Sequence, residues 1–230
     1  MRQFIISKRL HFGSDKEYNF VYSSFGVIHV LFTTLSLSMA PLDGVFWVNG
    51  LNTEFLDFVF QRITYFGNGV FMIPFLVILY LRKIYLSIAL ATSGLVQGCV
   101  VILFKQILFP FSDRPITKIK AGAAHLIPGL NIHHSNSFPS GHAVTVFGFC
   151  IFLALCYKNK LLTCMLLLLA TLVGISRVYL LQHYLMDVAV GALIGSLTSV
   201  VVFHVFEKVN KPSWMTTAPR FKLHLPLNHE

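Results

Sequence analysis

The chain has 230 residues, of which 55% are hydrophobic and 12% are charged, and its mean hydropathy is +0.70. A soluble domain of this length could not bury so many apolar side chains, so the composition predicts a membrane protein with the lipid bilayer as its solvent. The formal net charge is +9, and no polar domain that is both basic and aromatic is present to bind nucleic acid. We therefore expect no nucleic-acid partner.

Six apolar segments follow one another, each close to the ~20 residues that cross a bilayer. They are expected at 20–40, 65–81, 84–108, 142–157, 161–176 and 182–206, with Pro74 bending the second. The predicted fold class is all-α, a polytopic membrane protein with six transmembrane helices. No internal repeat is visible, and we expect residues 1–230 to form a single integral-membrane domain.

The basic residues predict the orientation of these helices. Twelve of them flank the segments on one side: Arg2, Lys8, Arg9, Lys16, Arg82, Lys83, Lys158, Lys160, Lys208, Lys211, Arg220 and Lys222. Six fall on the other side: Arg62, Lys105, Arg114, Lys118, Lys120 and Arg177. Because Lys and Arg accumulate in cytoplasmic loops, residues 1–18 and 208–230 are expected in the cytoplasm. The opposite face, outside the cell or in the periplasm of a bacterium, then carries the motifs described below.

The first apolar segment has a second interpretation. Ser38-Met39-Ala40 resembles the cleavage site of a signal peptide, but a run of about 20 residues exceeds the usual 7–15, which favours an uncleaved helix. Four cysteines lie inside apolar runs without C-x-x-C spacing, which indicates small core residues rather than metal ligands.

Pro139-Ser140-Gly141-His142 stands where a polar loop enters the fourth apolar segment. Ser140 is a typical helix N-cap, and Gly141 allows a ligand to approach the backbone. The free amides of a first helical turn favour an anion. The sequence therefore predicts either an anion site that His142 can reach, or a plain capped helix start.

His183 and Asp187 are four residues apart at the expected start of the sixth helix, which would place them on one helix face. A carboxylate that accepts from one ring nitrogen fixes the tautomer and makes the other nitrogen a nucleophile or base. Arg177, Lys105 and Arg114 add three cations near the same membrane face, although Lys105 alone could extend toward lipid headgroups. Three cations suit the three oxygens of a phosphoryl group.

These residues carry a resemblance to the membrane-bound type 2 phosphatidic acid phosphatase superfamily, which shares its site architecture with the vanadium haloperoxidases. The family signature is a Lys followed by Arg-Pro, then Pro-Ser-Gly-His, then Ser-Arg-x5-His-x3-Asp. Here the second part is 139–142, and the third runs from Ser176-Arg177 through His183 to Asp187 without deviation. In the first part, eight residues separate Lys105 from Arg114, where the common form has six. The resemblance covers 105–187 by motif.

The resemblance implies a mechanism. His183 attacks phosphorus and forms a phosphohistidine, Asp187 holds the imidazole, and His142 protonates the leaving oxygen before activating water. By the same resemblance, the residues that bind the phosphoryl oxygens are Lys105, Arg114, Ser140, Gly141 and Arg177. No metal and no other cofactor is implied, and the sequence offers no Asp/Glu cluster typical of a magnesium site.

The implied function is a metal-independent phosphatase acting on the phosphomonoester or pyrophosphate of a membrane lipid. For a bacterial inner-membrane protein the candidates are undecaprenyl pyrophosphate, phosphatidylglycerol phosphate, phosphatidic acid and lipid A phosphates. A phosphotransferase that passes the phosphoryl group to a second lipid would carry the same motifs. A non-catalytic binding or transport protein would distribute ionisable groups through the membrane depth instead of at one face. The sequence leaves the oligomeric state open.

Other conspicuous residues receive simpler interpretations. His29 and His204 are expected to pack or hydrogen-bond locally within apolar segments. His125, His133 and His134 lie on the polar loop, where a substrate headgroup contact is the weaker of two interpretations. Trp47, Tyr65 and Tyr179 fit an interfacial aromatic belt.

Overall fold

The computed structural model describes residues 15–217, and all the regular structure in that range is helical. Arg2, Lys8, Arg9, Arg220 and Lys222, on which part of the orientation prediction rests, lie outside the described residues. The helices are α1 Asp15–Ser38, α2 Pro41–Asn49, α3 Glu54–Ile63, α4 Ile73–Arg82, α5 Ile84–Ile102, α6 Gly141–Tyr157, α7 Lys160–Tyr179, α8 Leu185–Lys208 and α9 Ser213–Thr216. Short 3-10 turns cover Thr64–Gly67, Gly69–Met72 and Pro115–Lys118, and a π-helical turn covers Leu103–Leu108.

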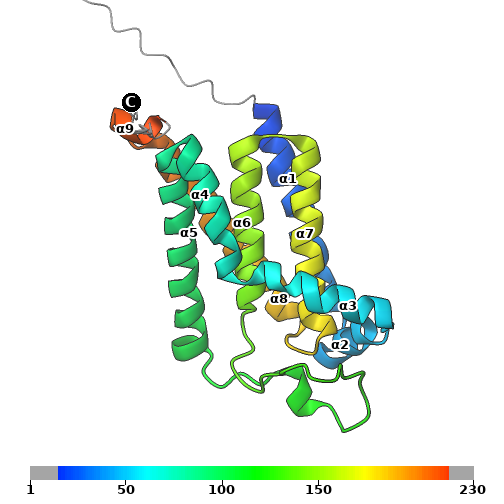
Figure 1. The fold of residues 1–230 in the computed structure, drawn as a ribbon. Coiled ribbons are helices and arrows are strands. Elements are labelled where there is room, and N and C mark those ends of the chain that lie inside the picture. Colours follow the sequence, from blue (N-terminus) through cyan, green and yellow to red (C-terminus); the bar gives the residue numbers. More distant parts are fainter. Residues whose placement is uncertain (1–14, 218–230) are drawn as a thin grey trace, which may run out of the picture.

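The long helices form a bundle with two different ends (Figure 1). Helices α2 and α3 and the connection between α5 and α6 lie across one end, whereas α9 and the α4–α5 and α6–α7 turns lie at the other. The second end is basic: the Lys158 ammonium lies 4.4 Å from the Tyr18 ring centroid, and that of Lys211 lies 4.8 Å from the Tyr85 centroid. We call these the loop end and the basic end.

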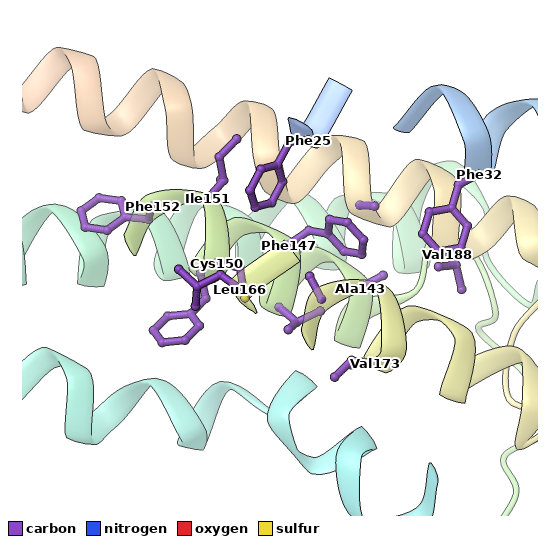
Figure 2. Close-up of a cluster of buried hydrophobic side chains, with 14 of the residues drawn as sticks. Phe25, Phe32, Ala143, Phe147, Cys150, Ile151, Phe152, Leu166, Val173 and Val188 are labelled. Carbon is purple, nitrogen blue, oxygen red and sulfur yellow. The ribbon is translucent and has the colours of Figure 1, made fainter. Parts of the chain in front are cut away.

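Helix α6 is the centre of the bundle and packs against α1, α5, α7 and α8. It is apolar on all sides, as expected of a helix with no solvent-facing surface. The ring of Phe147 meets those of Phe25 and Phe32 from α1 edge-on, with centroids 6.5 and 6.1 Å apart (Figure 2). The fourth predicted segment is therefore the helix around which the others assemble.

Helices α6 and α8 approach so closely that only glycine fits between them. A Cβ on Gly195 would lie 2.0 Å from the backbone oxygen of Val144, and one on Gly191 would lie 2.7 Å from that of Ser140. At the loop end the two helices are joined directly, since the Ser140 amide donates to the Asp187 backbone oxygen over 3.0 Å. This packing fixes the start of α6 against the start of α8.

In the part of the chain that the structure describes, four helices are long and apolar enough to cross a membrane: Lys16–Ser38, Ile84–Leu108, Lys160–Tyr179 and Leu185–Lys208. A bent pair, Glu54–Gly67 with Gly69–Arg82, adds a fifth if it is counted as one segment. All six predicted segments are helical for most of their length, but the structure itself supports a membrane protein with four or five such helices. Helix α6 falls short because it has only 17 residues.

The second predicted segment is bent at a different place from the one expected. The bend of 66° falls at Asn68, between Gly67 and Gly69, rather than at Pro74. Asn68 has an extended backbone (φ −80°, ψ 132°) and its side chain accepts from the Val70 amide at 3.2 Å. Pro74 lies in the first turn of α4, where a missing N–H disturbs no intrahelical bond. The prediction of a proline bend is therefore wrong.

Polar pairs hold α1 and α8 together inside the bundle. His29 Nε2 lies 3.0 Å from Ser196 Oγ, and the Tyr22 hydroxyl lies 2.5 Å from His204 Nε2. Both histidines pack and hydrogen-bond inside the bundle, as expected, but each has its partner on the other helix.

Candidate active site

Six separate elements bring the predicted site residues to the loop end. Lys105 comes from the π-helical turn and Arg114 from the connection that follows it; Ser140, Gly141 and His142 begin α6; Arg177 ends α7, His183 precedes α8 and Asp187 lies in its first turn. All but Lys105, Gly141 and His142 are buried. The charges of Arg177, His183, Lys105 and Arg114 all act on the His142 ring, which places the group in one cluster.

His183 and Asp187 pair as expected, but not on one helix face. His183 lies two residues before α8, and its Nδ1 is 3.3 Å from Asp187 Oδ2. The helix begins only at Leu185 because Tyr184 is its N-cap, and the Tyr184 amide donates to the same Asp187 oxygen at 3.0 Å. The expectation of a shared helix face is therefore wrong, because Asp187 caps the helix and His183 lies in the preceding turn.

A third group, absent from the sequence interpretation, completes this pair. The Ser137 hydroxyl donates to Asp187 Oδ2 and lies 3.4 Å from His183 Nδ1. Ser137 is 1% exposed, and its amide donates to the Ser112 backbone oxygen at 3.0 Å, so the loop holds it firmly. Three donors converge on one carboxylate oxygen, which fixes the Asp187 side chain and the ring beside it.

Arg177 reaches the cluster from the last turn of α7. Its Nη1 donates to Thr64 Oγ1 over 2.8 Å, and its Nε is buried without a hydrogen-bond partner among residues 15–217. A buried guanidinium N–H without an acceptor is costly, so a ligand with acceptor oxygens would satisfy it. Thr64 belongs to the 3-10 turn before the 66° bend, so that bend positions a contact of the site.

Arg114 is held on two sides. Its Nε donates to the Ser135 backbone oxygen at 2.8 Å, while its Nη1 donates to the backbone oxygen and to Oε1 of Gln182, at 3.0 and 2.8 Å. The side chain is 7% exposed, and burial lowers the pKa of its guanidinium from the usual value.

Lys105 projects from the π-helical turn that ends the α5 segment. Its ammonium donates to the Asn136 backbone oxygen at 2.7 Å and lies within the field of Arg114, Arg177 and Asp187. π-helical turns are rare and recur at functional sites. A π-helical turn holds an extra residue, so it takes up part of the long spacing between Lys105 and Arg114.

The start of α6 has the expected capped geometry. Ser140 is the N-cap and its Oγ accepts from the Ala143 amide at 3.4 Å. The amides of Gly141 and His142 belong to the first turn, where intrahelical acceptors are lacking and the helix dipole favours an anion. Gly67 touches His142 from the bend, since a Cβ there would lie 2.7 Å from the His142 Cβ.

The electrostatic environment favours a neutral imidazole at His183. Burial, and then the positive charges of Arg177, Arg114 and Lys105, hold the pKa of His183 well below its usual range. A neutral ring keeps a lone pair on one nitrogen at physiological pH. The arrangement thus offers a nucleophile among three cations, which is suited to an anionic, electrophilic group such as a phosphoryl.

The remaining candidates fall outside this cluster. His125 Nε2 contacts Asp57 Oδ2 at 2.8 Å, and the Tyr179 hydroxyl donates to Asp57 Oδ1 at 2.5 Å, which ties the loop to α3 and α7. Tyr179 is 1% exposed and is therefore no part of an interfacial belt, unlike the exposed Trp47 and Tyr65. His133 and His134 are exposed on the loop. Within residues 15–217, no three His, Cys, Asp or Glu side chains gather as metal ligands would.

The chain is similar to one protein family and to two bacterial proteins. A family model described as the PAP2 superfamily matches residues 82–211, more than half of the chain. The bacitracin transport permease protein BcrC of Bacillus licheniformis is 42% identical over 90 residues, which cover 36% of this chain and only 42% of that relative. Phosphatidylglycerophosphatase B of Bacillus subtilis strain 168 is 29% identical over 178 residues, covering 70% of this chain and 80% of that protein.

Two solved structures share the fold. The crystal structure of Aquifex aeolicus LpxE matches with a TM-score of 0.63 and 27% identity, over 72% of this chain and 96% of that one. A transmembrane PAP2 type phosphatidylglycerolphosphate phosphatase from Bacillus subtilis matches with a TM-score of 0.59 and 22% identity, over 83% of this chain and 98% of that one. The fold of the helical bundle is thus shared with proteins of known structure.

Proposed function

The chain belongs to the PAP2 superfamily, an enzyme family whose relatives named above include phosphatases, and we propose that it hydrolyses the phosphate ester or pyrophosphate of a membrane lipid. The observation that carries this proposal is the convergence of three cations on a buried His–Asp pair. Lys105, Arg114 and Arg177 supply positive charge where the equatorial oxygens of a phosphoryl group would lie.

The proposed first step is an in-line attack by His183. When the ring of His183 carries its proton on Nδ1, which faces Asp187, the lone pair is on Nε2. Nε2 is then free to form a bond to phosphorus while the bond from phosphorus to the lipid oxygen breaks. His142, protonated when the anionic substrate is bound, gives its proton to that leaving oxygen and becomes neutral. The first-turn amides of α6 and the three cations hold the negative charge on the phosphoryl oxygens.

The proposed second step releases phosphate. His142 takes a proton from a water molecule, the water oxygen attacks phosphorus, and the bond to Nε2 of His183 breaks. Asp187 stabilises the imidazole throughout, fixed by the Ser137 hydroxyl and the Tyr184 amide. The protein cations supply the charge that a metal ion supplies in other phosphoryl-transfer enzymes, so no metal is required in this scheme.

An apolar cavity supports a lipid as the substrate. It has a volume of about 730 Å³, lies between α4, α5 and α6, and its lining includes Leu76, Leu90 and Val101 together with His142. Hydrocarbon in this cavity would stay inside the bundle or the bilayer while the phosphate lies at the loop end. This arrangement fits a phosphorylated lipid better than a water-soluble phosphate ester.

The two ends of the bundle support a proposal for its orientation in the membrane. Lys158, Lys160 and Lys211 lie at the basic end, which suits the cytoplasmic face. The loop end would then face the outside, the bent pair and α6 would complete six membrane segments, and both termini would be cytoplasmic. In a bacterium the proposed location is the inner membrane, with the site toward the periplasm.

Phosphate release from a panel of lipid phosphates in detergent tests the proposal. The wild type should release phosphate in the presence of a chelator, and orthovanadate, which mimics the pentavalent transition state, should inhibit it. His183→Ala should abolish release, whereas His133→Ala, a change at an exposed loop histidine, should leave it intact. Release that depends on magnesium, or persists in His183→Ala, would overturn the scheme; transfer to an added acceptor lipid without release would indicate a phosphotransferase.

A further inference from the structure

The side chain of Gln182 is buried at the centre of the loop end, and the mechanism above gives it no role. It is 3% exposed and lies between Arg177 and His183 in the α7–α8 connection. We infer that Gln182 is a positioning residue, which holds the Arg114 guanidinium so that its free N–H groups face the bound phosphoryl oxygens. The inference rests on the proposed phosphate site and deepens it.

The hydrogen bonds of Arg114 show which of its donors remain for a ligand. A guanidinium carries five N–H donors. The Nε–H is used by Ser135, and the two acceptors of Gln182, its backbone oxygen and Oε1, match the two N–H groups of Nη1. Among residues 15–217 three of the donors are therefore occupied, and the two on Nη2 remain for the anion. Gln182 thus determines which edge of the guanidinium the site presents.

The side-chain amide of Gln182 is itself held in a single orientation. Its Nε2 donates to the Asn131 backbone oxygen over 3.2 Å, which directs Oε1 toward Arg114. With the amide rotated by 180°, an NH₂ group would face the guanidinium and an oxygen would face the Asn131 carbonyl, so both contacts would be repulsive. The orientation is therefore set by the two neighbours together.

The backbone around Gln182 is equally constrained. Leu181 adopts the left-handed conformation with φ of +58°, which is strained for a residue other than glycine. The amides of Gln182 and His183 both donate to the Arg177 backbone oxygen, at 3.0 and 3.1 Å. One strained turn thus carries Arg177 and His183, and through Gln182 it also sets the position of Arg114.

Arg114 requires such support because its own segment supplies little. It lies outside the helices, between the π-helical turn and the 3-10 turn at Pro115–Lys118. The exposed Phe111 in that connection has a left-handed backbone (φ +62°). The Arg114 amide donates to His134 and its backbone oxygen accepts from Thr117, and both of these partners lie outside the α-helices. The side-chain bonds to Gln182 therefore connect Arg114 to the rigid helical part of the site.

The test measures binding of orthovanadate to the purified protein in detergent, which needs no turnover. Gln182→Met keeps the length of the side chain but removes both polar atoms, and should raise the Kd for orthovanadate about tenfold, the loss expected for one hydrogen bond to a charged group. Arg114→Lys should raise the Kd further. The double variant should bind as Arg114→Lys alone does, because Gln182 acts through the Arg114 guanidinium.

Two further variants keep the inference testable if Gln182→Met does not fold. Gln182→Glu preserves an acceptor for Arg114 but neutralises its charge, and its second oxygen replaces the donor to the Asn131 carbonyl. Its folding is checked by thermal unfolding, and the folded variant should bind orthovanadate at least tenfold more weakly than the wild type. Gln61→Glu, at a half-buried position of α3, adds the same charge without replacing a bond to Arg114, and should weaken the binding of orthovanadate less than Gln182→Glu does. The inference would be overturned if both Gln182 variants bound orthovanadate with the wild-type Kd. It would also be overturned if the Kd effects of Gln182→Met and Arg114→Lys multiplied in the double variant.

The role of Gln182 and the proposed function can fail independently of each other. If orthovanadate binds as described but no lipid phosphate is hydrolysed, the proposed function fails and the role of Gln182 stands. If lipid phosphate is hydrolysed through His183 but Gln182→Met and Gln182→Glu bind orthovanadate as the wild type does, the role of Gln182 fails and the proposed function stands.

Discussion

Gly67 provides a direct test of the idea that the bend between α3 and α4 positions His142. A Cβ at residue 67 would lie 2.7 Å from the His142 Cβ and 2.9 Å from its Cδ2, and it would also lie 3.0 Å from Val173 Cγ1. Carbon atoms in contact are normally about 3.5–4.0 Å apart. Because the Cβ atom adjoins the backbone, the His142 ring cannot avoid the new methyl group by rotating its tip alone.

The magnitude follows from this overlap. Gly67→Ala must displace the His142 ring or the bend by on the order of 1 Å, and a misplacement of that size costs about 10²-fold in rate. We therefore expect kcat to fall about 100-fold, equivalent to about 2.7 kcal/mol in the barrier. The KM and the Kd for orthovanadate should change little, since the cations that bind the phosphoryl group remain in place.

Gly69→Ala is the matched control, because Gly69 lies two residues away in the same bent region and a Cβ there meets nothing within 4 Å. The assay is phosphate release from a detergent-solubilised lipid phosphate, with thermal unfolding of both variants measured alongside. Equal kcat values for the two variants would refute the reasoning. A loss of kcat in Gly67→Ala that disappears at lower temperature, in step with its unfolding, would do the same.

Three more changes probe other contacts of the site. Thr64→Val removes the acceptor for Arg177 and should raise KM about tenfold, the loss of one hydrogen bond to a charged group, with kcat less affected in steady-state assays. Gly195→Ala should force α6 and α8 apart, because its Cβ would lie 2.0 Å from a backbone oxygen of α6, and thermal unfolding should show strong destabilisation. Gly98→Ala, whose Cβ would have open space around it, should unfold as the wild type does. Burial and the neighbouring cations lower the pKa of His183 in the folded protein, so below about pH 6.5 the unfolded chain binds a proton that the folded protein does not. The free energy of unfolding should therefore fall as the pH falls below about 6.5, and thermal unfolding of His183→Gln should show a smaller fall.

The helices and the composition of the site could be predicted because their signals are local. Apolar runs of sufficient length mark the helices around α6, and the three motifs place charged residues at helix ends. The family resemblance drawn from the motifs is confirmed by the match over residues 82–211. The clustering of Lys105 with Arg114 and Asp187 follows because all the motifs lie at one end of the bundle.

The geometry between elements could not be predicted from these patterns. Ser137, Thr64 and Gln182 are uncharged polar residues whose partners lie 46 to 113 positions away in the chain, so no local spacing marks them. The displaced bend at Asn68 shows the same limit, because Pro74 is tolerated in the first turn of a helix whereas glycines allow a sharp change of direction. The i,i+4 spacing of His183 and Asp187 predicts a shared helix face, but the spacing alone does not reveal that the N-cap of α8 is Tyr184 and that His183 precedes the helix.

The central claim is that His183 becomes covalently phosphorylated during turnover. We would mix the protein rapidly with a lipid phosphate, quench in alkali to preserve a phosphorus–nitrogen bond, and locate the added phosphoryl group by mass spectrometry. The account predicts phosphorylation at His183 in the wild type and none in His183→Ala. A phosphoryl group on another residue, or hydrolysis at the wild-type rate by His183→Ala, would contradict it.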